Sequence, residues 1–268
     1  DAGGMGNHEF NYGLAFLSQI TNTDFGIPGV AKPTGTCGAP AFPSVLSNVV
    51  GVSSGKPIFQ PYTLLPRDFT ATAQTLIDAL PNPVVLCGWS LGGMLAVRAA
   101  VLAPERVNGL VLVGATASFT QRGDWRAAQA PAVVDSFSAS VRLQPEQTLQ
   151  RFVTLLSQGD NQARAITREL LASLNRAPGP QIEALGRGLD WLREIDLRPL
   201  LPAVTARCLL VHGENDPLNP LAAARYLAET IANARLEVFG GAGHAPFLND
   251  RERFVRLLDD FCHVRPAP

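Results

Sequence analysis

A serine in a glycine-flanked turn is the residue of this sequence best suited to chemistry. Residues 88–92 read G-W-S-L-G, a G-x-S-x-G motif between the apolar run Val84–Cys87 and the Ala- and Leu-rich segment Gly92–Leu102. In a strand-turn-helix context, the small glycines let strand and helix approach, so the serine hydroxyl projects from a strained turn. The backbone N–H of Leu91 then lies at a helix N-terminus and can stabilise an oxyanion. Ser90 is therefore predicted to be a nucleophile.

A serine hydroxyl is a weak nucleophile at neutral pH, so it needs a base, and the base needs an acid to orient it. Behind such a motif the expected chain order is Ser, then Asp or Glu, then His. Among the four histidines, His244 is the one late in the chain on a glycine-rich loop after an apolar run, and it is the predicted base. His212 ends a predicted strand, where a packed or hydrogen-bonded role is the simpler interpretation, and His263 lies in the polar C-terminal tail.

The acid is predicted in the turn that residues 213–217 form with the sequence G-E-N-D-P, after another apolar run. Asp216 is the first choice for this role. Glu214 in the same turn is the alternative acid, although helix capping or solvation explains it more simply.

The segments around these residues alternate between strand-like and helix-like patterns. Short apolar runs predict buried strands, and apolar positions at helical spacing predict helices. The predicted strands are Val84–Cys87, Leu110–Val113, Cys208–Val211 and Leu236–Phe239. The predicted helices are Ala71–Leu80, Gly92–Leu102, Leu221–Thr230 and Arg251–Phe261. Strand, turn, helix and strand in succession form a βαβ unit, which implies parallel strands and a right-handed crossover.

Two stretches depart from this alternation. Residues 118–196 contain no buried strand run and show helical spacing instead, as at Phe152, Val153 and Leu156, so a helical insertion is expected. Residues 1–67 are rich in Gly and Pro and contain two β-leaning runs, Val45–Val52 and Pro57–Leu65, which suggest a hairpin. We expect at least one of these runs to pair beside the strand at residues 84–87, because an unpaired apolar strand edge invites aggregation.

Bulk properties exclude several classes of protein. The 268 residues are 46% hydrophobic and 17% charged, which suits one large α/β domain or two small ones. A net charge of -1 without basic runs argues against nucleic-acid binding. Apolar runs are too short to cross a bilayer, the cysteines have no CxxC spacing, and the first residues resemble no signal peptide. A soluble, cytoplasmic protein with reduced thiols is expected, its sequence beginning inside a longer reading frame.

Residues 68–263 resemble the pimeloyl-[acyl-carrier-protein] methyl ester esterases of biotin synthesis. The likeness rests on GWSLGG at 88–93, PERV at 104–107, DLR at 196–198 and GHAPF at 243–247. It implies an α/β-hydrolase domain over residues 68–268, with a mostly parallel sheet and a helical cap at about 118–196. It also implies a serine carboxylic ester hydrolase that needs no cofactor and forms an acyl-serine on short to medium acyl esters. The methyl ester of pimeloyl-acyl carrier protein is a candidate substrate.

The same resemblance assigns the substrate-binding residues. The residues expected to contact the acyl chain are Trp89, Leu91 and Phe152, and those expected to contact the acidic carrier protein are Arg151, Arg164 and Arg168. Core packing is the alternative for the apolar three, and a solvated helix face is the alternative for the arginines.

The N-terminus departs from that family. Its members open with a strand and a His-Gly loop that supplies a second oxyanion N–H, and this chain has neither. Residues 1–66 instead resemble a fragment of the 5′-nucleotidase and cyclic-nucleotide phosphodiesterase family of metallophosphoesterases, through GNHEFNYG at 6–13 and GKPIFQPY at 55–62. In that family Gly-Asn-His-Glu supplies a metal-bound Asn and a catalytic His. A two-metal site needs further ligands and His8 has no companion cluster, so no metal is expected.

A chimera joined near Arg67 accounts for both resemblances, with the foreign segment replacing the N-terminal strands of the hydrolase. Loss of one oxyanion donor typically costs roughly a hundred- to a thousand-fold in rate. Three functions therefore remain: an ester hydrolase, a metal-dependent phosphoesterase, and a catalytically weak chimeric remnant.

Overall fold

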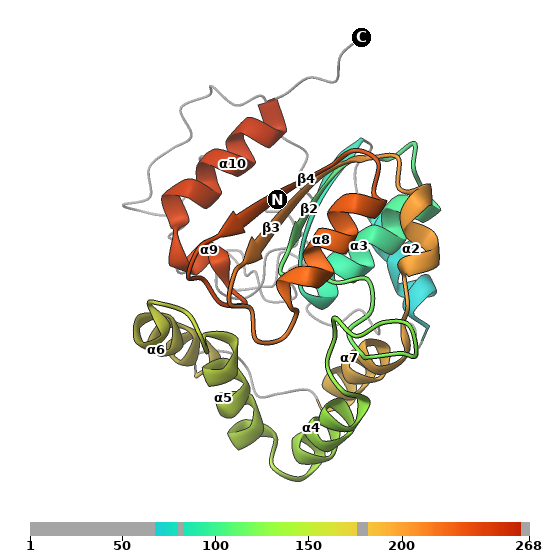
Figure 1. Cartoon of the computed structure of the whole chain (residues 1–268). Coiled ribbons are helices and arrows are strands. Elements are labelled where there is room, and N and C mark those ends of the chain that lie inside the picture. The colour runs from blue at the N-terminus through green and yellow to red at the C-terminus, as the bar shows by residue number, and fades with distance from the viewer. Residues whose placement is uncertain (1–67, 80–82, 176–181, 264–268) are drawn as a thin grey trace, which may run out of the picture.

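A four-stranded parallel sheet forms the centre of the computed structural model, which describes residues 68–79, 83–175 and 182–263 (Figure 1). Its strands, in spatial order, are β1 (Val84–Trp89), β2 (Val107–Val113), β3 (Arg207–Gly213) and β4 (Ala234–Phe239). All four predicted strands are confirmed, and each is somewhat longer than its apolar run. Side chains of the two central strands are enclosed on both faces, as expected for parallel strands covered by helices.

Helices cover both faces of this sheet. On one face lie α2 (Phe69–Ala79), α3 (Leu91–Leu102) and α8 (Leu221–Thr230), and on the other lies α10 (Arg251–His263), which follows the short α9 (Pro246–Asn249) (Figure 1). The predicted helices are confirmed, and the one at Leu221–Thr230 agrees to the residue.

Each face of the sheet has its own hydrophobic core. Met94 and Leu227 belong to the core on the side of α3 and α8, whereas Phe254 and Leu258 belong to the core on the side of α10. The helical spacing of the last helix is therefore explained by core packing.

Other expectations concern residues beyond the described ranges. The hairpin expected from Val45–Val52 and Pro57–Leu65 lies outside them, as do Cys37 and His8. Within the described residues, the cysteines form no disulfide, and burial raises the pKa of Cys208 to about 12. Among the helices of the described residues, none combines the length and the apolar composition that crossing a bilayer requires.

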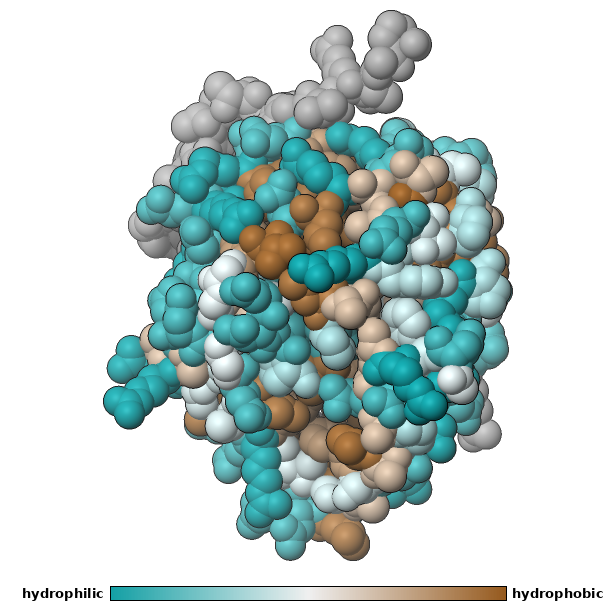
Figure 2. Space-filling model, in the orientation of Figure 1, coloured by the Kyte–Doolittle hydropathy of each residue, from teal (hydrophilic) through white to brown (hydrophobic). Residues whose placement is uncertain are grey.

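The helical insertion lies between β2 and β3 in the sequence and beyond the carboxyl ends of the strands in space (Figure 1). Its helices are α4 (Pro131–Leu143), α5 (Pro145–Leu156), α6 (Ala163–Leu174) and α7 (Ile182–Glu194), followed by the 3-10 helix η2 (Arg198–Ala203). We call α4–α7 the cap. Apolar residues are visible in the hollow between the cap helices, surrounded by hydrophilic ones (Figure 2). Edge-to-face packing of Trp191 in α7 on Phe69 in α2, with ring centroids 5.5 Å apart, fixes one side of the cap to the sheet layer.

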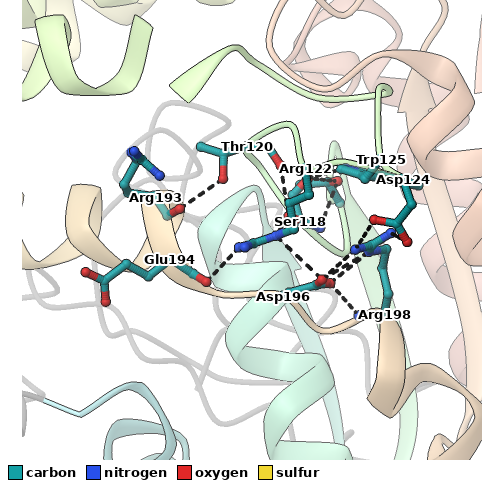
Figure 3. A network of polar contacts seen from close by, with 10 residues as sticks. Ser118, Thr120, Arg122, Asp124, Trp125, Arg193, Glu194, Asp196 and Arg198 are labelled. Atoms are coloured by element: carbon teal, nitrogen blue, oxygen red, sulfur yellow. Dashed lines mark hydrogen bonds and ion pairs between the residues drawn. The ribbon is translucent and has the colours of Figure 1, made fainter. Parts of the chain in front are cut away.

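A polar network ties the two ends of the cap together (Figure 3). Ser118 and Asp196 form an antiparallel bridge, so the chain entering the cap lies beside the chain leaving it. Arg198 donates to the carboxylates of Asp124 at 2.9 Å and Asp196 at 2.7 Å, and Arg122 donates to the hydroxyl of Ser118 at 3.0 Å. The hydrogen bond from Arg198 lowers the pKa of Asp124. We call this network the cap staple.

Candidate active site

Ser90 occupies a strained turn between β1 and α3. Its φ of 55° makes it the single non-glycine residue with positive φ in the described part of the chain. Such a conformation costs on the order of 1–3 kcal/mol and is typical of functional sites. The half-buried side chain makes no capping hydrogen bond to α3, which leaves its hydroxyl available for chemistry.

The glycines around Ser90 are required by close packing. A Cβ on Gly88 would lie 2.3 Å from the carbonyl oxygen of Gly92, and a Cβ on Gly93 would lie 2.7 Å from Cβ of Ala115. Both distances are far below van der Waals contact, so strand and helix could not approach this closely with larger residues. This explains why the G-x-S-x-G pattern folds into a sharp turn here.

Leu91 is the first residue of α3, so its N–H has no acceptor within the helix. That N–H belongs to the positive end of the helix dipole, directly after the serine. The side chain of Leu91 is half-buried against the core on the α3 side. The position therefore suits an oxyanion donor, whereas the side chain has a packing role of its own.

The predicted base and acid are hydrogen-bonded to each other. Nδ1 of His244 lies 2.7 Å from Oδ2 of Asp216, and both side chains are almost completely enclosed. The other carboxylate oxygen accepts the backbone N–H groups of Leu218 and Asn219, each at 2.9 Å. Nε2 of His244 is buried without a hydrogen-bond partner among the described residues, so it is free to accept a proton.

The surroundings of Asp216 keep it ionised. Burial alone would raise its pKa, but attraction to His244, the hydrogen bond between them and further donors outweigh burial and hold the pKa below the ordinary carboxyl value. An ionised acid can orient the imidazole and stabilise the imidazolium that forms during proton transfer.

The alternative acid lies elsewhere. Glu214 is exposed and accepts the backbone N–H of Gly241 at 3.0 Å, so it orders the loop before the histidine without bonding to its ring. The structure thus brings Asp216, and not Glu214, to His244.

His244 is fixed from several directions. Its backbone oxygen accepts the indole N–H of Trp89 at 2.9 Å. Gly114, with φ of 50°, passes so close that a Cβ there would lie 3.1 Å from the same oxygen. Asn219 donates to the carbonyl of Gly114 at 2.7 Å. Sequence reasoning missed Asn219, because nothing in its local pattern shows that it reaches a strand end 105 residues earlier.

The three predicted acyl contacts are placed in different surroundings. The ring of Trp89 packs edge-on against Phe247, with centroids 5.2 Å apart, and tilted against His244. Phe152 of α5 faces Phe137 of α4 at 5.3 Å within the cap. Packing is therefore seen for all three residues, including Leu91, and their role as acyl contacts stays a prediction.

The three predicted carrier-protein contacts come together in one place. Arg151, Arg164 and Arg168 are all exposed and line an open groove of about 1040 Å³ between α5 and α6. We call this the arginine groove. Among the described residues, no group of His, Cys, Asp and Glu is arranged to hold a metal ion.

Known proteins similar to this chain include methyl ester esterases. Pimeloyl-[acyl-carrier protein] methyl ester esterase of Nitrosomonas europaea is 39% identical over 186 residues, which cover 69% of this chain and 74% of that protein. The protein of the same name from Photobacterium profundum is 38% identical over 189 residues, with 70% and 74% covered.

Solved structures agree with the fold. An esterase from Exiguobacterium antarcticum superimposes with a TM-score of 0.67 at 27% identity, covering 74% of this chain and 75% of that one. A bromoperoxidase from Bacillus anthracis shares the fold at 17% identity, with a TM-score of 0.66 and coverage of 75% and 76%. Residues 36–257 match the family described as the alpha/beta hydrolase family.

Proposed function

Since this chain belongs to the alpha/beta hydrolase family and is a carboxylic ester hydrolase, we propose that Ser90, Asp216 and His244 are its catalytic triad. The observation that carries the proposal is the buried pair of Asp216 and His244, whose 2.7 Å hydrogen bond leaves Nε2 of the imidazole without a partner among the described residues.

In the first half of the proposed reaction, Ser90 Oγ attacks the ester carbonyl carbon while Nε2 of His244 takes the hydroxyl proton. The carbonyl oxygen becomes an oxyanion that the Leu91 N–H stabilises. When the oxyanion collapses, the bond to the alkoxy oxygen breaks and His244 returns its proton to that oxygen. An alcohol leaves and an acyl-serine remains.

The second half repeats these steps with water as the nucleophile. His244 takes a proton from water, the hydroxide attacks the acyl carbon, and the bond to Ser90 Oγ breaks with return of the proton to that oxygen. The products are a carboxylic acid and the free serine, so no cofactor is required.

We propose the methyl ester of pimeloyl-acyl carrier protein as the substrate, which would place the enzyme in biotin synthesis. The names of the curated relatives support this substrate. The arginine groove also supports it, because three exposed guanidinium groups on neighbouring helices suit an acidic partner protein. Trp89, Leu91 and Phe152 are the proposed contacts of the acyl chain.

Substitution of Ser90 tests the triad. Purified Ser90→Ala should lose hydrolysis of p-nitrophenyl butyrate and of dimethyl pimelate while its thermal unfolding midpoint stays near that of the wild type, because the hydroxyl makes no capping bond. Near-wild-type hydrolysis by this variant would refute the assignment. A low wild-type rate, lost in the same variant, would identify the weak chimeric remnant instead.

For residues 1–66 we propose an origin in a metallophosphoesterase, with the hydrolase domain beginning near residue 68. The support is the sequence likeness at residues 6–13 and 55–62, which lie outside the described part of the chain. The hydrolase family match begins at residue 36, inside this segment. Chelator-sensitive hydrolysis of bis-p-nitrophenyl phosphate that disappears in His8→Ala would show that the segment is also active.

A further inference from the structure

The connection between α5 and α6 runs along the loops that carry the proposed acid and base. We call residues 156–162 the α5–α6 strap. The backbone N–H of His244 donates to the carbonyl of Leu156 at 3.0 Å, and the N–H of Asn161 donates to the carbonyl of Gly241 at 2.8 Å. On the acid side, the amide of Asn215 donates to the carbonyl of Gly159 at 2.9 Å. The strap therefore binds the loops of both proposed catalytic groups.

Glycines make this approach possible. A Cβ on Gly243 would lie 3.0 Å from the carbonyl oxygen of Leu156 and 3.4 Å from Cβ of Asp160. Gly159 has φ of 81°, and a Cβ there would lie 3.2 Å from Cβ of Asn215. Strap and loops are thus in backbone contact, so a displacement of one must displace the other.

Asp160 is the one buried acidic side chain of the strap, at 8% exposure. Its Oδ2 accepts the backbone N–H of Gly243 at 2.8 Å, directly before the proposed base. Its Oδ1 accepts the N–H of Gln162 at 2.7 Å and the side-chain amide of Asn249 in α9 at 2.9 Å. All three partners donate hydrogen bonds. A carboxylate suits them because, when ionised, both of its oxygens accept hydrogen bonds and neither donates one.

We propose that Asp160 is a positioning residue for His244, one that fixes residues 240–244, which we call the base loop, to the cap and to α9. The inference rests on the proposed triad. Asp160 takes no part in proton transfer. It holds the backbone N–H of Gly243, and that peptide group sets the position and orientation of the His244 imidazole. A protein in which His244 is misplaced by a fraction of an ångström still folds and still binds the acyl chain. Its imidazole, however, accepts the serine proton less efficiently.

The isosteric variant Asp160→Asn tests this role. Its NH2 group must face either the N–H of Gly243 or the two donors at the other oxygen. The hydrogen bonds on that side of residue 160 are therefore lost. Asn161→Ala is the matched control, because it removes an exposed side-chain bond from the same strap to the same Asn249.

With p-nitrophenyl butyrate, we expect kcat of Asp160→Asn to fall at least about tenfold with KM within about twofold of the wild type, because the loss affects proton transfer and not binding. Asn161→Ala should keep kcat within about twofold. Proton NMR should show the low-field Nδ1–H resonance of His244 broadened or shifted in Asp160→Asn and unchanged in the control.

Equal kcat values for Asp160→Asn and the control would overturn the proposal. If Asp160→Asn does not fold, Asn249→Ala decides instead, because it removes one donor from the carboxylate: a fall in kcat supports the role and an unchanged kcat overturns it. Ser90→Ala, assayed in parallel, distinguishes failure of the proposed triad from failure of the positioning role. An active Ser90→Ala refutes the triad itself, whereas an inactive Ser90→Ala beside a fully active Asp160→Asn refutes the positioning role alone.

Discussion

Nε2 of His212 lies 3.5 Å from Oδ2 of Asp216, so two imidazoles, those of His212 and His244, approach the same carboxylate oxygen. His212 is 1% exposed, and its Nε2 is 2.7 Å from the backbone oxygen of Asn219, which can only accept a hydrogen bond. Nε2 therefore carries a proton, and neutral His212 donates to that carbonyl. The second imidazole is a structural partner of the turn that presents the acid.

This arrangement predicts a pH-dependent stability. Burial lowers the pKa of His212 below its ordinary 6.5, against the opposing attraction of Asp216. As pH falls below 6.5, the unfolded chain takes up a proton that the folded protein does not bind, so the free energy of unfolding decreases. In His212→Gln, which keeps a donor and removes the titration, urea unfolding between about pH 7.5 and 5.5 should show a shallower decrease. An equal slope in both proteins would contradict this.

Asp216→Asn should be one of the most damaging single substitutions for catalysis. The amide cannot orient the imidazole in the required tautomer or stabilise its charged form, and in a triad this costs about 10³- to 10⁴-fold in kcat. Steady-state hydrolysis of p-nitrophenyl butyrate measures the loss. The control is Glu214→Gln in the same turn, which should stay within a few-fold because its carboxylate bonds only the N–H of Gly241 among the described residues. A larger loss in Glu214→Gln than in Asp216→Asn would reverse the assignment of the acid.

Two glycines should respond in opposite ways to alanine. In Gly213 an added Cβ would lie 1.9 Å from the carbonyl oxygen of Gly243, so Gly213→Ala must displace the base loop and should lower both the unfolding midpoint and kcat. Gly186 lies inside α7 and has open space at its Cβ position, so Gly186→Ala should add up to about 1 kcal/mol of stability through helix propensity. Thermal unfolding of the two variants checks the pair, and a stable, fully active Gly213→Ala would be unexpected.

Charge reversal should separate carrier binding from ester hydrolysis. The triple variant Arg151→Glu, Arg164→Glu and Arg168→Glu should raise KM for a carrier-protein-linked methyl ester by at least about tenfold and leave p-nitrophenyl butyrate hydrolysis unchanged, because complementary charge acts on protein association. The wild-type KM for the carrier substrate should also rise with salt. Arg256→Glu on α10, whose side chain is 66% exposed, is the control for loss of positive charge. Equal KM values for the triple variant and this control would remove the arginine groove from the proposal.

Local patterns predicted most of the sheet layer. The limits of α8 agree to the residue, because amphipathic spacing and the preceding proline act within one segment. Residues 88–92 were assigned correctly as a strand-turn-helix junction for the same reason, since the glycines and the serine lie together in the chain.

Long-range contacts could not be predicted in the same way. Asp160 stands in a run of small and polar residues that reads as an ordinary turn, and its three donors come from residues 162, 243 and 249. The choice between Asp216 and Glu214 also depended on which carboxylate faces the ring after folding, since both lie in the same turn. Neither property is encoded in spacing along the sequence.

The cap staple has a consequence for how the chain can change its specificity. Because Ser118 and Asp196 are paired and Arg198 bonds carboxylates on both sides, the cap begins and ends at one point of the sheet layer. An insertion whose ends are already joined can change in length at a loop-closure cost that grows only slowly with loop length. The sheet and the α5–α6 strap, which holds the loops of the proposed acid and base, can thus be kept while the lengths and the exposed side chains of the cap helices change to suit another acyl or protein partner.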